Sequence, residues 1–418
     1  MTGQLPLFAL ESTMPQHGTV HAFPFALDPG SPDDPGGEHL LSEAPMARTE
    51  LADGTPLWVA LGHRVCRQVL TDPVFSRTAA LEPGAPTVSR GLSLPAMLTG
   101  LDGAEHARVR RVVARAFTPR TVEGLRPWIT ALVDELIGSL AGRTGPVDLV
   151  EHLATPLPVL VVCRLFGVPY EDRDRFRAWT EALLTRDGAA EDVMAAFGLM
   201  RDYLHRLVAD RRAVPRSDLT SELARIAAET GDLTEEHLVN NLLLFLVAGH
   251  DTTLNQLANS LVALLVEPER YALLRRRPDL VDNAVEELLR HLLLTPGGTL
   301  TRVALRDTEL GGVTVRAGEG VVALQHVANR DPEVFPDPGR LDLAREGLQA
   351  HLAFGAGPHF CAGAQLARLE LRTVIAALIS AFPGLRLAVP PAELRWREGG
   401  LLRGPLALPV LLTSPARC

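Results

Sequence analysis

Apolar positions recur at helical spacing along most of the chain, whereas short apolar runs typical of strands are confined to a few places. Helical periodicity dominates residues 105–183 and returns over 190–212. Residues 232–266 form one unusually long, mostly apolar helical segment. Strand-like runs follow at 300–305, 312–315 and 320–324. The pattern predicts a mainly α fold with small β-sheets.

The chain shows no internal division beyond an unusual beginning. Residues 1–50 are rich in proline, glycine and acidic residues, which predicts an irregular N-terminal arm that wraps the body. No repeat, glycine/serine linker or long charge run divides the rest, so we expect a single domain over 1–418. Polar residues in the middle of 232–266 argue against a membrane span.

Composition narrows the classes of partner and compartment. The 418 residues are 46% hydrophobic and carry a formal charge of −9, and all 41 basic residues are arginines. This acidic excess argues against nucleic-acid binding, although a local arginine patch could still meet an acidic protein. The four cysteines are widely separated, without a CxxC pair or a secretory leader, so we expect reduced thiols and a cytoplasmic, soluble protein.

A glycine-rich loop places one of these cysteines just before a helix. Residues 354–363 read Phe-Gly-Ala-Gly-Pro-His-Phe-Cys-Ala-Gly, and a helix is predicted from Ala364 to Ala381. Free N–H groups at a helix start favour negative charge, and metals bind the thiolate. Cys361 is therefore a candidate metal ligand. Cys66 and Cys163 lie in apolar helical stretches and are predicted to be buried hydrophobes, and Cys418 is a terminal residue.

A second polar cluster interrupts the long apolar segment with Ala-Gly-His-Asp-Thr-Thr over residues 248–253. An apolar helix does not cheaply bury such groups, so functional side chains with perturbed pKa values are favoured. Thr252 can donate to the carbonyl of Ala248, and Gly249 removes bulk where a ligand must approach. These residues predict a small pocket. For His250 taken by itself, we expect packing or a salt contact rather than a functional role.

These motifs, in this order, resemble the cytochrome P450 family. The cysteine loop matches every defining position of the family's haem-binding signature, Phe-Gly-x-Gly-x-x-x-Cys-x-Gly, and residues 248–252 resemble its Ala-Gly-x-(Asp/Glu)-Thr element. Residues 287–290, Glu-Leu-Leu-Arg, resemble its Glu-x-x-Arg element. The resemblance covers nearly the whole chain from about residue 55. It implies a single-domain fold with the haem between the long helix and the cysteine-loop helix.

The resemblance also implies roles for individual residues. Cys361 would be the iron ligand, and Asp251 and Thr252 the acid–alcohol pair that carries protons to bound oxygen. The residues implied at haem b, iron protoporphyrin IX, are His106, Arg110, Ala248, Gly249, Arg302, Phe354, Gly355, His359, Cys361, Ala362 and Gly363. Glu287, Arg290 and Arg340 would form a structural network. Gly103-Ala104 replaces the prolines common before this histidine, and Leu341 replaces a common aromatic residue.

By position in similar proteins, the substrate would face a mainly apolar set of residues. This set is Leu94, Met97, Leu243, Leu244, Val247, Leu294, Gly297, Gly298, Leu401 and Leu402. The resemblance implies a soluble bacterial monooxygenase of actinobacterial type that hydroxylates a hydrophobic natural-product substrate with O2. Electrons would come from a ferredoxin and its reductase. Arg108, Arg111, Arg115 and Arg368 would offer its docking surface, unless they are an ordinary solvated face.

Two other functions remain open. A protein of the same family could couple aromatic substrates through C–C or C–N bonds without inserting oxygen. A haem-based sensor that is not an enzyme is a distant alternative, because a sensor would need no acid–alcohol pair and usually carries an output domain.

Overall fold

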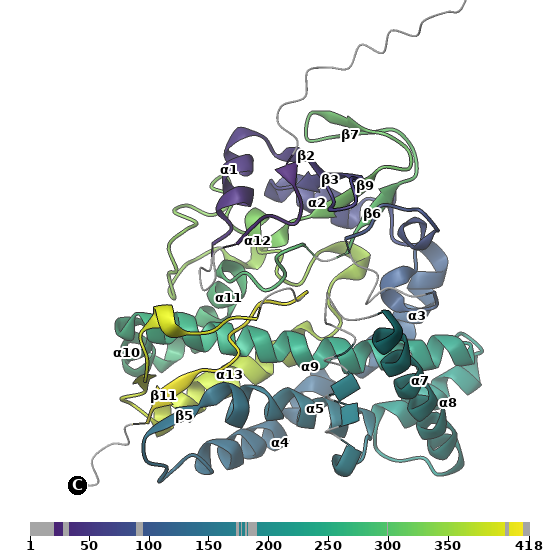
Figure 1. The fold of residues 1–418 in the computed structure, drawn as a ribbon. Helices are drawn as coiled ribbons and strands as arrows, with labels where there is room; N and C mark the ends of the chain where they lie inside the picture. The colour runs from purple at the N-terminus through teal and green to yellow at the C-terminus, as the bar shows by residue number, and fades with distance from the viewer. Residues whose placement is uncertain are drawn as a thin grey trace, which may run out of the picture.

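The computed structural model describes residues 21–27, 33–88, 95–172, 190–298, 300–397 and 401–412, together with 175, 176, 178, 179 and 182. Its α-helices are α1 (Pro35–Glu43), α2 (His63–Thr71), α3 (Gly103–Ala116), α4 (Pro119–Gly138), α5 (Pro156–Phe166), α7 (Ala190–Ala213), α8 (Leu219–Thr230), α9 (Glu235–Val266), α10 (Pro268–Arg276), α11 (Val281–His291), α12 (Gln325–Ala328) and α13 (Ala364–Ala381). Helix α9 crosses the middle of the molecule (Figure 1). The predicted mainly helical fold is confirmed.

The strands form three small sheets. Their bounds are β1 (His21–Ala22), β2 (Met46–Glu50), β3 (Pro56–Ala60), β4 (Phe75–Ser76), β5 (Pro146–Asp148), β6 (Arg302–Ala304), β7 (Thr308–Leu310), β8 (Val313–Val315), β9 (Gly320–Ala323), β10 (Arg386–Leu387) and β11 (Pro409–Leu411). The largest sheet has the order β1-β2-β3-β9-β6-β4, and the others are β10-β11-β5 and β7-β8. In the largest sheet β3 runs parallel to β9, with Leu57 opposite Gly320. This pairing joins segments from both ends of the chain.

Helix α9 is long because its sequence caps one end and offers no break inside. Thr234 precedes the helix, and its hydroxyl accepts the N–H of His237 at 3.1 Å. No proline occurs until Pro268, which opens α10. Apolar residues occur on every side of α9, so it is buried by neighbouring helices rather than lying on the surface. No described helix is long and apolar enough to cross a bilayer.

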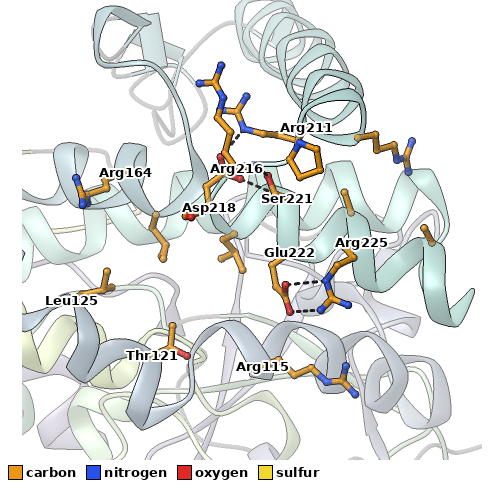
Figure 2. Close-up of a pocket in the computed structure, with 17 residues that line it drawn as sticks. Arg115, Thr121, Leu125, Arg164, Arg211, Arg216, Asp218, Ser221, Glu222 and Arg225 are labelled. Atoms are coloured by element: carbon orange, nitrogen blue, oxygen red, sulfur yellow. Dashed lines mark hydrogen bonds and ion pairs between the residues drawn. The ribbon is translucent and has the colours of Figure 1, made fainter.

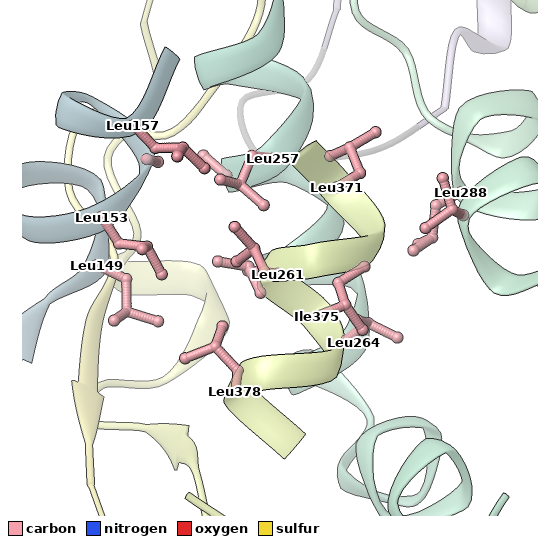
Figure 3. Packing of buried hydrophobic residues seen from close by; sticks show 14 of the residues in the cluster. Leu149, Leu153, Leu157, Leu257, Leu261, Leu264, Leu288, Leu371, Ile375 and Leu378 are labelled. Carbon is pink, nitrogen blue, oxygen red and sulfur yellow. The ribbon is translucent and has the colours of Figure 1, made fainter. Parts of the chain in front are cut away.

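The core fixes α9 against α13, as Figure 3 shows. Leu257, Leu261 and Leu264 lie on one stripe of α9, three or four residues apart, and Leu371, Ile375 and Leu378 form the matching stripe on α13. Leu149, Leu153 and Leu157 close the cluster from the segment leading into α5. This packing sets the position of the polar cluster of α9 relative to the cysteine loop, because that loop leads directly into α13.

The described part of the N-terminal arm is more regular than the sequence predicts. It contains α1 and β2 because the body of the protein holds both elements. Asp34 caps α1 by accepting the N–H of Gly37 at 2.9 Å, and His326 contacts the same carboxylate at 2.8 Å. Arg330 binds Asp33 and Glu38 at 2.6 and 2.8 Å. The proline and glycine content therefore misled the prediction over residues 35–50.

The predicted Glu287–Arg290–Arg340 network needs a correction. Glu287 and Arg290 are fully buried and form a two-bond pair at 2.7 and 2.8 Å. Arg340 does not join them, because its side chain is 69% exposed and its carboxylate neighbour, Asp342, lies 4.0 Å away. Only the Arg340 carbonyl takes part. Arg345 is instead the third member of the network, with Nε 3.1 Å from Oε1 of Glu287.

Replacing Arg345 by alanine should therefore lower the free energy of unfolding by about 3 kcal/mol, because a buried carboxylate loses one of its two cations. Arg340→Ala should change it by less than about 0.5 kcal/mol, as expected for an exposed side chain. Urea unfolding followed by circular dichroism measures both values. Equal losses in the two variants would contradict the corrected network.

Candidate haem site

A largely apolar cavity lies between α9 and the cysteine loop. The predicted residues that line it are Arg110, Leu244, Ala248, Gly249, Thr252, Phe354, His359, Cys361, Ala362 and Gly363. They come from α3, α9 and the loop before α13. The fold thus brings most of the predicted cofactor residues together around one space.

The cysteine loop has a shape that depends on its glycines. The N–H of Cys361 donates to the carbonyl of Phe354 at 2.9 Å, which folds residues 354–361 back on themselves. Gly357 has a φ of 68°, and a Cβ there would lie 2.9 Å from Cγ2 of Thr71 in α2. The loop therefore packs tightly against α2 while Cys361 faces the cavity. Among the described cysteines, Cys66 and Cys163 are buried as predicted, and Cys361 is accessible only as part of the lining of the cavity, inside the protein.

The charge state of Cys361 reflects opposing influences. Burial of the sulfur raises the pKa of the Cys361 thiol, and this effect outweighs the others. The backbone N–H groups of Gly363 and Ala364, with the charges of Arg110 and Arg368, lower the same pKa. The predicted contribution of the helix start therefore has the expected direction, but it is smaller than the desolvation of the sulfur.

Basic side chains gather at one edge of the cavity. His106 and His359 lie with their ring centroids 4.2 Å apart, and Arg110 donates to the carbonyl of Phe360 at 2.7 Å. Arg302 is buried and donates to the carbonyl of Phe75 at 3.2 Å. Arg77, which the sequence analysis missed, is buried beside them and donates to the carbonyls of Thr99 and Thr301. Its only sequence signal is a lone arginine after a short strand.

One carboxylate, Asp102, lies in this basic cluster. It accepts the hydroxyl of Ser76 at 2.6 Å and the N–H groups of Arg77 and Thr78 at 2.7 and 2.9 Å, and it lies 3.6 Å from Nε2 of His359. Burial alone would raise the pKa of Asp102, but these hydrogen bonds hold it well below its ordinary value.

Burial and mutual proximity lower the pKa values of these basic groups. Burial, then the neighbouring His359 and Arg110, lowers the pKa of His106 to about 4. Burial, then Arg302, lowers the pKa of Arg77 to about 9, and burial lowers that of Arg302 to about 10. Nε2 of His106 is buried without a hydrogen-bond partner among the described residues. An anionic group is the natural complement of such a cluster.

These residues fit haem. A porphyrin with two propionates would bring carboxylates to the basic cluster while its apolar ring filled the cavity, and Cys361 offers sulfur to a metal. The fit rests on the orphaned nitrogen of His106 and on the excess of cations over carboxylates at this edge. Fold and site together define a haem-thiolate protein.

Ala248, Gly249, Thr252 and Thr253 of the α9 cluster form the opposite wall, whereas Asp251 and His250 are not among the lining residues. The Thr252 hydroxyl donates to the carbonyl of Ala248 at 2.5 Å, which confirms the predicted bond. Asp251 is buried, and Nδ1 of His250 lies 3.6 Å from its Oδ1. Burial raises the pKa of Asp251 to about 6, against a lowering effect of Arg397. Gly249 has a second reason to be glycine, since a Cβ would lie 2.9 Å from Cγ2 of Val162 on α5.

The predicted substrate residues are distributed unevenly. Leu244 lines the cavity directly. Met97, Leu243, Val247, Leu294, Leu401 and Leu402 belong to the hydrophobic cluster beside it. A Cβ at Gly298 would lie 2.4 Å from Val322, so that glycine packs against β9, and Gly297 is also not among the lining residues. Leu94 lies outside the described residues. Leu98, Thr99 and Glu370 line the cavity but were missed.

Comparison with known proteins agrees with this geometry. The cytochrome P450 family model matches residues 174–389. Nocardicin C N-oxygenase of Nocardia uniformis subsp. tsuyamanensis is 45% identical over 94% of this chain and 98% of its own. The LnmA cytochrome P450 hydroxylase of the leinamycin pathway of Streptomyces atroolivaceus is 43% identical, with a TM-score of 0.86 over 94% of this chain and 100% of its own.

A third relative is cytochrome P450mel 107F1, described as having biaryl coupling reactivity. It is 35% identical, with a TM-score of 0.88 over 94% of this chain and 100% of its own. The chain belongs to the cytochrome P450 family. It is a bacterial cytochrome P450 monooxygenase, and the family implies haem with a cysteine thiolate and O2.

Glu370 should make stability depend on pH. This α13 residue is 2% exposed, and burial raises its pKa to about 8 from 4.5. A carboxyl whose pKa is raised on folding favours the folded state below its unfolded pKa and loses that contribution as pH rises through the folded pKa. Between pH 4.5 and 8 the wild type should therefore lose stability, on the order of a few kcal/mol, relative to Glu370→Gln.

Urea unfolding of both proteins at half-unit pH intervals measures this difference. The glutamine variant is the matched control, because it keeps the shape of the side chain but cannot ionise. Parallel pH profiles for the two proteins would show that Glu370 titrates normally.

Proposed function

We propose that this protein uses haem b to insert one oxygen atom from O2 into a mainly hydrophobic organic substrate in natural-product biosynthesis. One observation carries the proposal: the cavity has Cys361 on one side and Thr252, bonded to Ala248, on the other. A thiolate ligand and a proton-delivering alcohol facing the same space are what oxygen activation requires.

The residues around the cavity divide the work of holding the cofactor. Cys361 would hold the haem iron through its sulfur, and its loop is fixed by the bond to Phe354 and by the contact of Gly357 with α2. His106, Arg110, Arg302 and His359 would bind the propionates, and Arg77, buried beside Arg302, would add positive charge there. When bound, the haem supplies the electron transfer to O2 and the oxygen-insertion chemistry.

Asp251 and Thr252 hold and move protons. The Thr252 hydroxyl donates its hydrogen bond to the Ala248 carbonyl, so its oxygen can accept a hydrogen bond from a group in the cavity. Asp251 has a pKa of about 6 because it is buried, which suits both taking up and releasing a proton near neutral pH. Nδ1 of His250 lies 3.6 Å from the Asp251 carboxylate and holds that carboxylate in place.

The names of two similar proteins support the proposed chemistry. One is an N-oxygenase acting on nocardicin C, and another is a hydroxylase of leinamycin biosynthesis. The cavity of this chain is walled by Leu98, Val162, Leu244 and Phe245, which favours an apolar substrate. In the proposed reaction, the substrate, O2, two electrons and two protons yield one oxygenated product and one water.

Oxidative coupling is the second candidate, and cytochrome P450mel favours it. Coupling would use the same Cys361 and the same cofactor, but two aromatic groups would have to lie side by side in the cavity. Oxygen would then be reduced without entering the product.

An acidic ferredoxin is the proposed electron donor, and the structure refines its predicted docking surface. Arg368 is committed to Glu286 at 2.7 Å, and Arg108 lies 3.6 Å from Glu105. Arg111 and Arg115 are exposed on α3, and Arg115 borders a groove of about 890 Å³ between α4, α5 and α8 (Figure 2). Arg216 enters the same groove without a carboxylate partner among the described residues. Arg111, Arg115 and Arg216 are therefore the proposed contacts.

A substrate screen tests the proposed reaction. Displacement of iron-bound water shifts the haem absorption band, so apolar natural products can be ranked by this shift and then turned over with a ferredoxin, its reductase and ¹⁸O₂. The expected product is heavier by one labelled oxygen. A dimeric or cyclised product without the label would establish coupling instead.

Cys361→Ser should lose the thiolate spectrum of the reduced carbon monoxide complex, and an unchanged spectrum would remove Cys361 from its role.

Thr252→Ala should divert reducing equivalents from product to hydrogen peroxide, because the variant lacks the hydroxyl oxygen that accepts a hydrogen bond in the cavity and so delivers protons poorly. The peroxide-to-product ratio should rise by about tenfold or more. Ser260→Ala, eight residues along the same helix and not among the cavity-lining residues, is the matched control. The measurement is NADPH consumed, peroxide formed and product formed in one reaction. An unchanged ratio in Thr252→Ala would remove the assigned role of this residue.

A further inference from the structure

Two neighbouring asparagines are buried in the apolar first half of α9. Asn240 and Asn241 are 3% and 2% exposed, and they lie between buried apolar residues on both sides along the helix. Burying an amide is unfavourable unless its polar atoms find partners. The partners of this pair therefore indicate what the pair is for.

Those partners lie in residues 95–98, which precede the cavity wall. Oδ1 of Asn241 accepts the N–H of Leu98 at 2.8 Å, and its Nδ2 donates to the carbonyl of Ala96 at 2.9 Å. Nδ2 of Asn240 donates to the carbonyl of Pro95 at 3.0 Å. The Asn241 amide thus binds two backbone groups of the segment as a neighbouring strand would, and Asn240 adds a third bond.

The segment needs such support because its backbone is strained. Ala96 has a φ of 63°, in the left-handed region that a residue with a Cβ rarely adopts. Such a conformation persists only where surrounding contacts determine it. The two bonds of Asn241 fall on the strained residue and on the residue two positions later, so they fix the turn from both ends.

The segment also carries the wall of the cavity. Met97 is fully buried in the cluster formed with α9, and Leu98 lines the cavity. On α9, Leu244, Phe245, Ala248 and Thr252 line the same cavity at three, four, seven and eleven residues after Asn241. Asn241 therefore lies on the cavity-facing stripe of α9 and forms its polar end.

We propose that Asn241, supported by Asn240, is a positioning residue that fixes Met97 and Leu98 in the substrate wall and so determines which ligands the cavity admits. Neither asparagine is among the residues that line the cavity, so the pair acts through the 95–98 backbone. The selectivity part of the proposal rests on the proposed haem-binding function, whereas the positioning part does not.

Hydrogen exchange tests the positioning part. In Asn241→Leu, amide exchange over residues 95–101 should accelerate by about tenfold or more, because two hydrogen bonds are lost, and Asn240→Leu should show a smaller increase. Ser260→Ala is the matched control, since Ser260 is also buried on α9 but donates only to Gln256 within the helix, at 2.7 Å. No acceleration in Asn241→Leu, or the same acceleration in Ser260→Ala, would overturn the proposal.

Binding of two azoles tests the selectivity part. Association of 4-phenylimidazole with the haem protein should be about fivefold or more faster in Asn241→Leu, and that of imidazole should change by less than about twofold, because only the larger probe requires the wall to move. Equal changes for both azoles, or none, would overturn the selectivity role. If imidazole gave no absorption change even in the wild type, the proposed haem function would fail, and the exchange result would still decide the positioning role.

Discussion

The site depends on the repulsion among the buried basic groups at one edge of the cavity. His106, Arg77 and Arg302 all have lowered pKa values, because burial and mutual proximity disfavour their charged forms. Asp102 offsets only part of this charge, and its carboxylate is already occupied by Ser76 and backbone N–H groups. The folded chain therefore carries a local demand for anions in a protein whose overall charge is −9. Haem propionates would supply such anions, so cofactor binding would relieve the repulsion within the fold.

Helix α9 converts this site into an enzyme by fixing the surrounding segments with its polar side chains. Asn241 binds Ala96 and Leu98, and Asn259 donates to the carbonyl of Arg403 at 2.9 Å, while Thr252 bonds to Ala248 within the helix itself. The apolar stripes between these positions pack the helix against α5 and α13. Apolar contacts alone would permit small slips along the helix axis, whereas each amide bond is satisfied in only one register.

The sequence predicts the parts of the site whose chemistry is local. The cysteine loop, the Thr252 bond and the long helix follow from glycine positions, a helical four-residue spacing and periodicity. The rest depends on tertiary contacts. Arg345 replaces Arg340 because the turn after Asp342 directs one guanidinium inward and leaves the other in solvent. Arg77 has no motif, and α1 is held by Arg330 and His326, almost 300 residues away along the chain, while β2 is held by its pairing with β3.

The contrast between the parts of the site that follow from local sequence and the parts that depend on tertiary contacts bears on which reaction the enzyme catalyses. An N-oxygenase, a hydroxylase and a coupling enzyme all resemble this chain over 94% of its length, so their shared fold supports different outcomes. A difference in outcome must then arise in groups that set how a substrate lies, rather than in the groups that hold iron or protons. In this chain the proposed groups of this kind are Met97, Leu98 and Leu402, which lie outside the α-helices and strands. Because α9 binds the backbone of these segments, their side chains can vary while the backbone that places them stays fixed.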